Sequence, residues 1–263
     1  MYHAHGAQMQ SACLSRQVGA ALVDRKGNII ATGTNEAPRA GGGVYREPLD
    51  KQDPDFRCAM FPNSADRFCR NTQTQNEIIQ ELIKEIPELN AASEKRKEAL
   101  EAELRKTKIG SLIEFSRAVH AEMSALLSAA RNGTPLIGTK LFVTTFPCHY
   151  CARHIITAGV DEVQYIEPYP KSLALKLHSD AIIVEPVGEW TPPSNGGQKV
   201  LFRPFSGVSP RLYKRAFLKE RELKDKNTGI INIQNPQWGT PWQLSKVSYP
   251  ELEAELTEEI PSA

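Results

Sequence analysis

One histidine, one glutamate and two cysteines lie at spacings that suit metal-assisted hydrolysis. His120 and Glu122 are separated by one residue, and Cys148 and Cys151 are separated by two in the segment PCHYC. On a helix, residues i and i+3 share a face, so the two sulfurs should point the same way. A cysteine at the start of a helix ionises readily, and the thiolate is the form that binds metal. Two thiolates favour zinc.

The number of ligands indicates the kind of zinc site. A structural site uses four protein ligands, whereas a catalytic site uses three and keeps one position for water. The sequence has no second Cys-x-x-Cys, and His120 with Cys148 and Cys151 makes three ligands. Zinc lowers the pKa of bound water toward about 7, and a nearby carboxylate, that of Glu122, can take the proton and pass it on.

Other interpretations of the cysteines and histidines are open at this point. Cys148 and Cys151 could be a redox pair or two buried apolar residues, although their combination with His-x-Glu favours zinc. His149 and His154 are rival ligands. His149 should point about 100° away from Cys148 around the helix, and His154, one turn further on, suits packing better than ligation.

The elements that must position these residues alternate between strand and helix. Apolar, β-rich runs predict strands over 18–24, 28–35, 140–145, 162–169, 181–187 and 199–205. Helical spacing predicts helices over 7–17, 74–86, 91–106, 120–133, 147–159 and 172–179. Both ligand segments open a helix, and the order predicts an α/β protein with helices packed on a central sheet.

Composition narrows the class of protein. The chain has 263 residues, 40% hydrophobic and 24% charged, with a formal net charge of +1. This balance argues against general electrostatic binding to nucleic acid or anionic lipid. No stretch reaches the length of a membrane span. Five scattered cysteines do not suggest a disulfide framework, so we expect a reducing, cytoplasmic location.

Several segments resemble the cytidine/deoxycytidylate deaminase superfamily, whose zinc motif is H-x-E followed by P-C-x-x-C. They are SRQVGAALVD (15–24), ATGTNEAPRAG (31–41), HAEMSALLSAARNG (120–133), VTTFPCHYCARHIITAG (143–159) and VQYIEPYPKSLA (163–174). The segments RAVHAEM, TTFPCHYCARHI and VLFRPFSGVSPRLYKRAF (200–217) are similar to the deaminase half of bacterial anti-phage deoxycytidylate deaminases.

The resemblance implies a three-layer α/β/α cytidine deaminase-like fold around a mixed five-stranded sheet. It also implies that residues 1–263 form a single deaminase domain. The core would cover about 7–45 and 119–187, with a helical insertion at 46–118 and a C-terminal extension at 188–263.

The resemblance also implies an activity and its residues. One zinc ion would be held by His120, Cys148 and Cys151, with Glu122 transferring protons, and dCMP or dCTP would become dUMP or dUTP plus ammonia. Such an enzyme could deplete nucleotides against phage, and a homo-oligomer is expected. Residues implied to contact the nucleotide are Asn35 at the sugar, the Ala121 amide at the base, Thr145 and Tyr169. Arg16, Arg39 and Lys171 could be phosphate partners, although an ordinary surface charge is the favoured interpretation of each.

Two other functions and one other metal site remain as alternatives. The basic stretch 211–226 would suit a cytosine deaminase of single-stranded DNA or RNA. A non-catalytic, nucleotide-binding zinc module would be expected to lack Glu122, which is present. Cys13, Cys58 and Cys69 could hold a second, structural zinc, but no histidine lies between 6 and 119 to complete that site.

Overall fold

The protein is described from a computed structural model that covers residues 1–50, 52–184, 188–217 and 228. The chain divides into two compact units, Met1–Gly207 and Val208–Ala263. Within the second unit, the described residues include helix α8 (Pro210–Phe217). Residues 218–226 of the basic stretch 211–226 lie outside the described residues. The domain boundaries expected from the resemblance stay a prediction.

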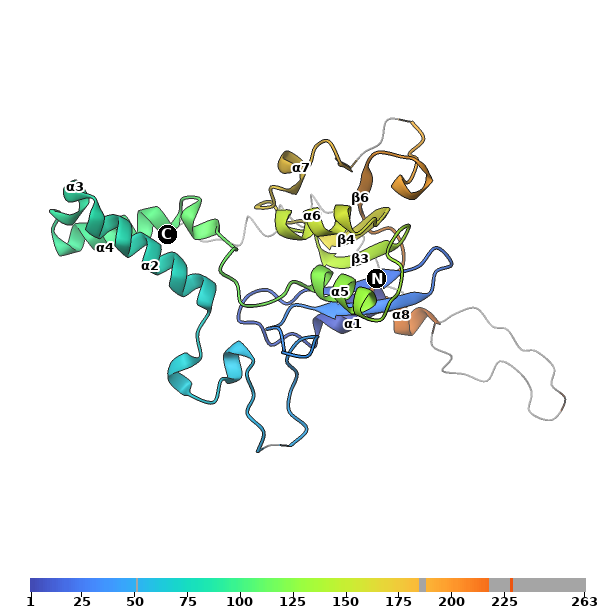
Figure 1. Ribbon diagram of the computed structural model, residues 1–263, viewed down its shortest axis with the longest axis horizontal. Coiled ribbons are helices and arrows are strands. Elements are labelled where there is room, and N and C mark those ends of the chain that lie inside the picture. Colours follow the sequence, from blue (N-terminus) through green and yellow to red (C-terminus); the bar gives the residue numbers. More distant parts are fainter. Residues whose placement is uncertain (51, 185–187, 218–227, 229–263) are drawn as a thin grey trace, which may run out of the picture. The chain divides into compact units, whose positions relative to one another are not determined.

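A mixed sheet of six strands forms the centre of the first unit (Figure 1), in the order β2-β1-β3-β4-β6-β5. The strands are β1 (Gly19–Val23), β2 (Ile29–Thr34), β3 (Lys140–Thr145), β4 (Glu162–Glu167), β5 (Ile182–Ile183) and β6 (Val200–Pro204). β1 pairs antiparallel with β2 and β3, and the pairs from β3 onward are parallel. The expected count of five strands is therefore wrong. The additional strand is β6, which comes from the predicted extension and lies between β4 and β5.

Two glycines show how helices cover both faces of this sheet. A Cβ on Gly19 of β1 would collide with the backbone of α1 (Tyr2–Gln8), and a Cβ on Gly33 of β2 would collide with the backbone of α5 (Ala121–Arg131). Gly33 pairs with Ala20, the neighbour of Gly19. Because successive residues of a strand point to opposite faces, α1 and α5 lie on opposite sides. The fold is therefore a three-layer α/β/α arrangement, as expected.

The sheet interior is apolar and closely packed beneath the predicted site. Leu141 and Val143 of β3, Val163 of β4 and Phe202 of β6 are fully buried. Phe146, directly after β3, meets the ring of Phe202 at 5.7 Å between centroids in an edge-on arrangement. The strand that sequence reasoning placed in an extension therefore belongs to the core.

The helix predicted over 7–17 is wrong, because the helix is α1 (Tyr2–Gln8) and an irregular segment follows it. Backbone amides of that segment donate hydrogen bonds to side chains that lie far along the chain, instead of to carbonyls within a helix. The Ala12 amide donates to Glu36 Oε2 at 2.9 Å, and the Val18 amide donates to Asn35 Oδ1 at 2.6 Å. Side chains that supply hydrogen bonds to the backbone compete with helix formation. We call residues 11–18 the N-terminal loop.

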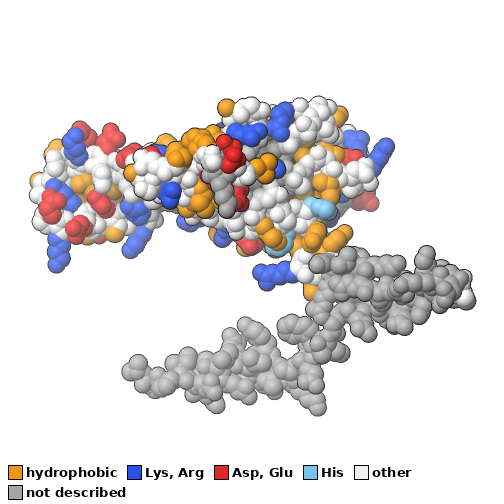
Figure 2. Space-filling model, turned by 90° about the horizontal axis from the view of Figure 1, so that it is seen from below, with side chains coloured by type: hydrophobic (Ala, Val, Ile, Leu, Met, Phe, Trp, Pro, Cys, Tyr) orange, Lys and Arg blue, Asp and Glu red, His pale blue; other side chains and the backbone are white. Residues whose placement is uncertain are grey.

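The insertion contains a helical hairpin of α2 (Arg70–Glu85), α3 (Pro87–Asn90) and α4 (Glu94–Arg105). Ile79 and Ile83 of α2 are buried. Figure 2 shows acidic and basic side chains interspersed over these helices, as expected for a solvated hairpin. Hydrogen bonds tie the start of α2 to the segment that leads to His120. Asn71 Nδ2 and Gln75 Nε2 both donate to the Leu112 carbonyl, at 2.8 and 2.6 Å. No helix in the described part of the chain is long and apolar enough to cross a membrane.

Candidate metal centre

The three predicted zinc ligands come from the first residues of two helices. His120 is the N-cap of α5, and Cys148 is the N-cap of α6 (His149–Thr157). Cys148 follows the end of β3 by three residues, and Cys151 lies in the first turn of α6. An antiparallel bridge between Val119 and Glu36 fixes the chain just before His120. The predicted convergence of the two helix openings is present.

The ligand atoms are spaced as a metal would require. His120 Nδ1 lies 3.3 Å from Cys148 Sγ and 3.4 Å from Cys151 Sγ. With ordinary Zn–N and Zn–S bond lengths, a tetrahedral site has nitrogen–sulfur edges of about 3.6 Å. All three ligand atoms lie within 4.8 Å of one another. One nitrogen and two sulfurs at this spacing fit a zinc ion with one open position.

The electrostatics of the triad favour a thiolate on Cys148. The hydrogen bond with Cys151 lowers the pKa of Cys148 to about 4, against the effect of burial and with help from His120. Burial, together with the neighbouring Cys148, raises the pKa of Cys151 well above its usual value. The bond to Cys148 raises the pKa of His120 in spite of burial. A cation at this point would therefore meet at least one charged sulfur.

Glu122 lies beside the triad and is 4% exposed. Burial, followed by the Cys148 thiolate, raises the pKa of its carboxyl to about 7. A carboxyl with a pKa near neutrality can both accept and release a proton at physiological pH. Its position on the first turn of α5 follows from the two-residue spacing to His120.

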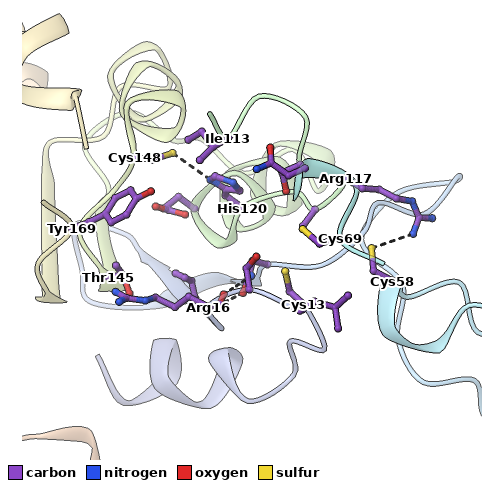
Figure 3. Close-up of a pocket in the computed structure, with 18 of the residues that line it drawn as sticks. Cys13, Arg16, Cys58, Cys69, Ile113, Arg117, His120, Thr145, Cys148 and Tyr169 are labelled. Carbon is purple, nitrogen blue, oxygen red and sulfur yellow. Dashed lines mark hydrogen bonds between the residues drawn. The ribbon is translucent and has the colours of Figure 1, made fainter. Parts of the chain in front are cut away.

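A cavity of about 410 Å³ opens onto the triad (Figure 3). Six of the predicted site residues line it: Asn35, His120, Glu122, Thr145, Cys148 and Tyr169. Ala121 and Cys151 are fully buried and are not in the lining. Figure 3 shows Thr145, Tyr169 and Arg16 on one side of His120, and Cys13, Cys58 and Cys69 toward the other.

Asn35 has a structural role that the sequence did not indicate. Its Oδ1 accepts from the Val18 amide at 2.6 Å, and its Nδ2 donates to the Arg16 carbonyl at 2.9 Å. Arg16 in turn pairs with Glu167 at 3.1 Å, and Glu167 also accepts from Thr145 at 3.4 Å. Asn35 thereby holds the N-terminal loop at the cavity, and each of its amide atoms keeps one further hydrogen-bonding site.

Sequence reasoning missed the contribution of the insertion to the cavity. Cys58, Cys69, Arg70, Asn71 and Arg117 all line it. The Arg117 guanidinium donates to the Phe56 carbonyl at 2.7 Å and lies over the Phe61 ring at 5.0 Å. The signal that could have found Arg117 is its position three residues before His120.

Other candidates are not brought to the triad. Arg39 is not among the residues that line the cavity, unlike Arg16 and Lys171. His154 Nδ1 lies 2.6 Å from the Tyr150 carbonyl. Neither His149 nor His154 belongs to the ligand group. Cys13, Cys58 and Cys69 share the cavity, but within the described ranges their sulfurs do not form a group at ligand spacing.

Comparison with known families decides the class of this site. Residues 1–167 match the family described as "Cytidine and deoxycytidylate deaminase zinc-binding region". The chain belongs to this family. The matched residues include the Asn35 loop, the openings of α5 and α6, and β4. The zinc-binding region in the family's description agrees with the group of His120, Cys148 and Cys151.

The chain is also similar to individual proteins. The chain is 30% identical over 175 residues to the deoxycytidylate deaminase of Enterobacteria phage T4, covering 62% of this chain and 73% of the relative. It is 44% identical over 71 residues to a probable deoxycytidylate deaminase of Drosophila melanogaster, covering 26% and 34%. A crystal structure of the cyanophage S-TIM5 dCMP deaminase in complex with dCMP and dUMP aligns with a TM-score of 0.39 and 19% identity, covering 77% of this chain and 90% of that chain.

Proposed function

We propose that this protein is a zinc-dependent hydrolase that deaminates a deoxycytidine nucleotide, dCMP or dCTP, to the deoxyuridine nucleotide and ammonia. The observation that carries the proposal is the convergence of His120, Cys148 and Cys151 beside the buried Glu122 carboxylate, at the wall of one cavity. Membership of the deaminase family supports the reaction type.

His120, Cys148 and Cys151 would hold the zinc. When bound, zinc supplies Lewis-acid chemistry, which makes water a nucleophile near neutral pH. The Glu122 carboxylate would take a proton from the attacking water and deliver it to the departing amino group, so that cytosine becomes uracil and ammonia leaves. A pKa of about 7 for Glu122 suits a group that must both accept and release a proton.

The charge of the cavity supports a nucleotide in preference to a nucleoside. Arg16, Arg70, Arg117 and Lys171 line it, whereas Glu122 is the one acidic residue among the described residues of the lining. A cleft of one charge sign concentrates oppositely charged ligands. Asn35, Thr145, Tyr169 and the Ala121 amide remain the proposed contacts to sugar and base. A cytoplasmic location, a homo-oligomer and a role in lowering dCTP during phage infection remain predictions from the resemblance.

The direct test measures ammonia release by the zinc-loaded protein from dC, dCMP, dCTP, CTP and a cytosine-containing oligonucleotide. Turnover of dCMP or dCTP is expected, with little turnover of the oligonucleotide. Deamination of the oligonucleotide alone would support the polynucleotide alternative instead. Absence of product from every substrate would support the non-catalytic module.

A matched pair of variants tests the proton-transfer role. Glu122→Gln is expected to lower turnover by about 10²–10⁴-fold while zinc remains bound, because the amide cannot take up the proton. Glu94→Gln, on the exposed face of α4, should behave as the parent protein. Unchanged product formation by Glu122→Gln would refute the assignment.

A further inference from the structure

Three thiols that the proposed reaction does not use line the same cavity. Cys13 lies in the N-terminal loop, Cys58 begins a short 3-10 helix (Cys58–Met60), and Cys69 is the N-cap of α2. All three are free and partly exposed. Figure 3 shows Cys13 and Cys69 neighbouring one another, while Cys58 is turned toward Arg117. Two separate parts of the chain thus bring sulfurs to one wall of the cavity.

The Cys69 sulfur is placed for nucleophilic chemistry. Burial would raise its pKa, but interactions with the Thr72 hydroxyl and the Thr72 and Asn71 amides outweigh burial, so the pKa is lowered. These amides belong to the first turn of α2, a helix of 16 residues whose opening favours negative charge. The Ser15 hydroxyl contributes in the same direction. A thiolate of this kind attacks disulfides more readily than an ordinary thiol.

The Cys13 thiol, unlike that of Cys69, has a raised pKa. Burial raises the pKa of Cys13, and the neighbouring Glu36, Cys58 and Cys69 raise it further, while the Ser15 amide lowers it. Ser15 thus acts on both sulfurs, through its amide on Cys13 and through its hydroxyl on Cys69. The influence of Ser15 on both thiols agrees with their neighbouring positions in Figure 3.

The N-terminal loop fixes Cys13 at this place. The Ser11 hydroxyl donates to the Asn35 carbonyl at 2.7 Å, and the Cys13 amide donates to the Ser11 hydroxyl at 3.2 Å. Gln17 Nε2 donates to the Ser11 carbonyl at 2.6 Å. On the other side, the Arg117 guanidinium lies 3.7 Å from the Cys58 sulfur, and Figure 3 shows Cys13 beside Cys69.

We propose that Cys13 and Cys69 form a redox-active dithiol, which a small-molecule disulfide such as oxidised glutathione converts reversibly into an intramolecular disulfide. The Cys69 thiolate attacks the disulfide, forms a mixed disulfide and releases one small thiolate. Cys13 then loses its proton and attacks the Cys69 sulfur, which releases the second small thiolate. Two protein thiols are oxidised, and one small disulfide is reduced to two thiols.

The bond would join the N-terminal loop to the start of α2 across the cavity wall. The same loop carries Arg16 and is held by Asn35. The oxidised protein is therefore expected to lose most of its turnover and to recover it with dithiothreitol. This consequence rests on the proposed function, whereas formation of the bond does not.

The experiment treats the zinc-loaded, full-length protein with oxidised glutathione and follows it by intact mass and peptide mapping, with a chromophoric chelator reporting any zinc release. The expected product is a cross-linked pair of peptides containing Cys13 and Cys69, with no loss of zinc. Modification of Cys69 should be at least about tenfold faster than that of Cys58.

Three serine variants separate the roles of the thiols. In Cys13→Ser, the reaction should end at a stable mixed disulfide on Cys69. Cys69→Ser should form neither this mixed disulfide nor an intramolecular disulfide at the parent rate. Cys58→Ser is the matched control and should oxidise as the parent does. The proposal is overturned if Cys69→Ser oxidises at the parent rate, if the bond uses Cys58, or if a second zinc ion per chain protects all three thiols. None of these readouts depends on deaminase activity.

Discussion

Gly33 of β2 lies directly against the backbone of α5, and adding one methyl group there should displace His120, a proposed zinc ligand at the start of that helix. A Cβ on this residue would lie within 3.0 Å of the Ala121 carbonyl oxygen and the Ala125 nitrogen, and 3.1 Å from the Ala125 Cα. These are backbone atoms, which cannot rotate away. In Gly33→Ala, α5 must therefore move off β2 by about 1 Å, and such overpacking costs about 1–3 kcal/mol of unfolding free energy.

The displacement matters because His120 caps α5, whereas both cysteines lie on or next to α6. The distances of 3.3 and 3.4 Å from His120 Nδ1 to the two sulfurs would no longer be kept. A misplacement of about 1 Å can cost about 10²-fold in turnover. We expect weaker zinc binding, measured by competition with a chromophoric chelator, together with lower turnover and a lower urea midpoint.

Gly6→Ala is the matched control. A Cβ on Gly6 meets nothing within 4 Å, and the residue lies inside α1. Replacing glycine by alanine within a helix should stabilise the protein by about 0.5–1 kcal/mol. Gly33→Ala with parental zinc affinity, turnover and stability would refute the argument that contact between β2 and α5 positions His120.

Other perturbations test separate parts of the molecule. Glu162, 2% exposed, pairs with Lys140 of β3 at 2.9 Å and Arg203 of β6 at 2.6 Å, so Glu162→Gln should cost about 2–3 kcal/mol in urea unfolding at pH 7. Burial opposes charge on Glu162, but its partners hold the pKa below the ordinary value, so this cost should disappear as the pH falls through the folded-state pKa. Free zinc at a hundred times its Kd should raise the unfolding free energy by about 2.7 kcal/mol over chelator-treated protein, measured by thermal melts. Asn35→Ala loses the bonds to the Arg16 carbonyl and Val18 amide and should cost about 1–3 kcal/mol, with KM rising more than kcat falls; an unchanged KM would contradict its positioning role.

Local patterns in the sequence were sufficient to predict that His120, Cys148 and Cys151 lie close together. His120 and Cys148 each cap a helix, and the spacing within each motif determines which side chains share a helix face. The strand over 140–145 lies where β-rich residues placed it. These features depend on neighbours within a few residues, so the sequence contains them directly.

Features that depend on distant residues were not predicted. The N-terminal loop is irregular because Asn35 and Glu36 supply bonds to its backbone from 17 to 24 residues away. The insertion reaches the cavity because Asn71 and Gln75 bond to Leu112, about forty residues along the chain. Strand order likewise depends on pairing between distant segments, so β6 was assigned to an extension.

The place of β6 between β4 and β5 also affects how the protein is made. Every residue of the proposed zinc site precedes position 152, yet β4 gains its second neighbour only when residues 200–204 have been synthesised. Until then, a nascent chain on the ribosome presents the bare hydrogen-bonding edge of a buried parallel strand, which is a template for aggregation. Premature termination between β5 and β6 would therefore yield a polypeptide with all the side chains of the proposed zinc site but a strong tendency to associate, and cells would be expected to remove it by proteolysis.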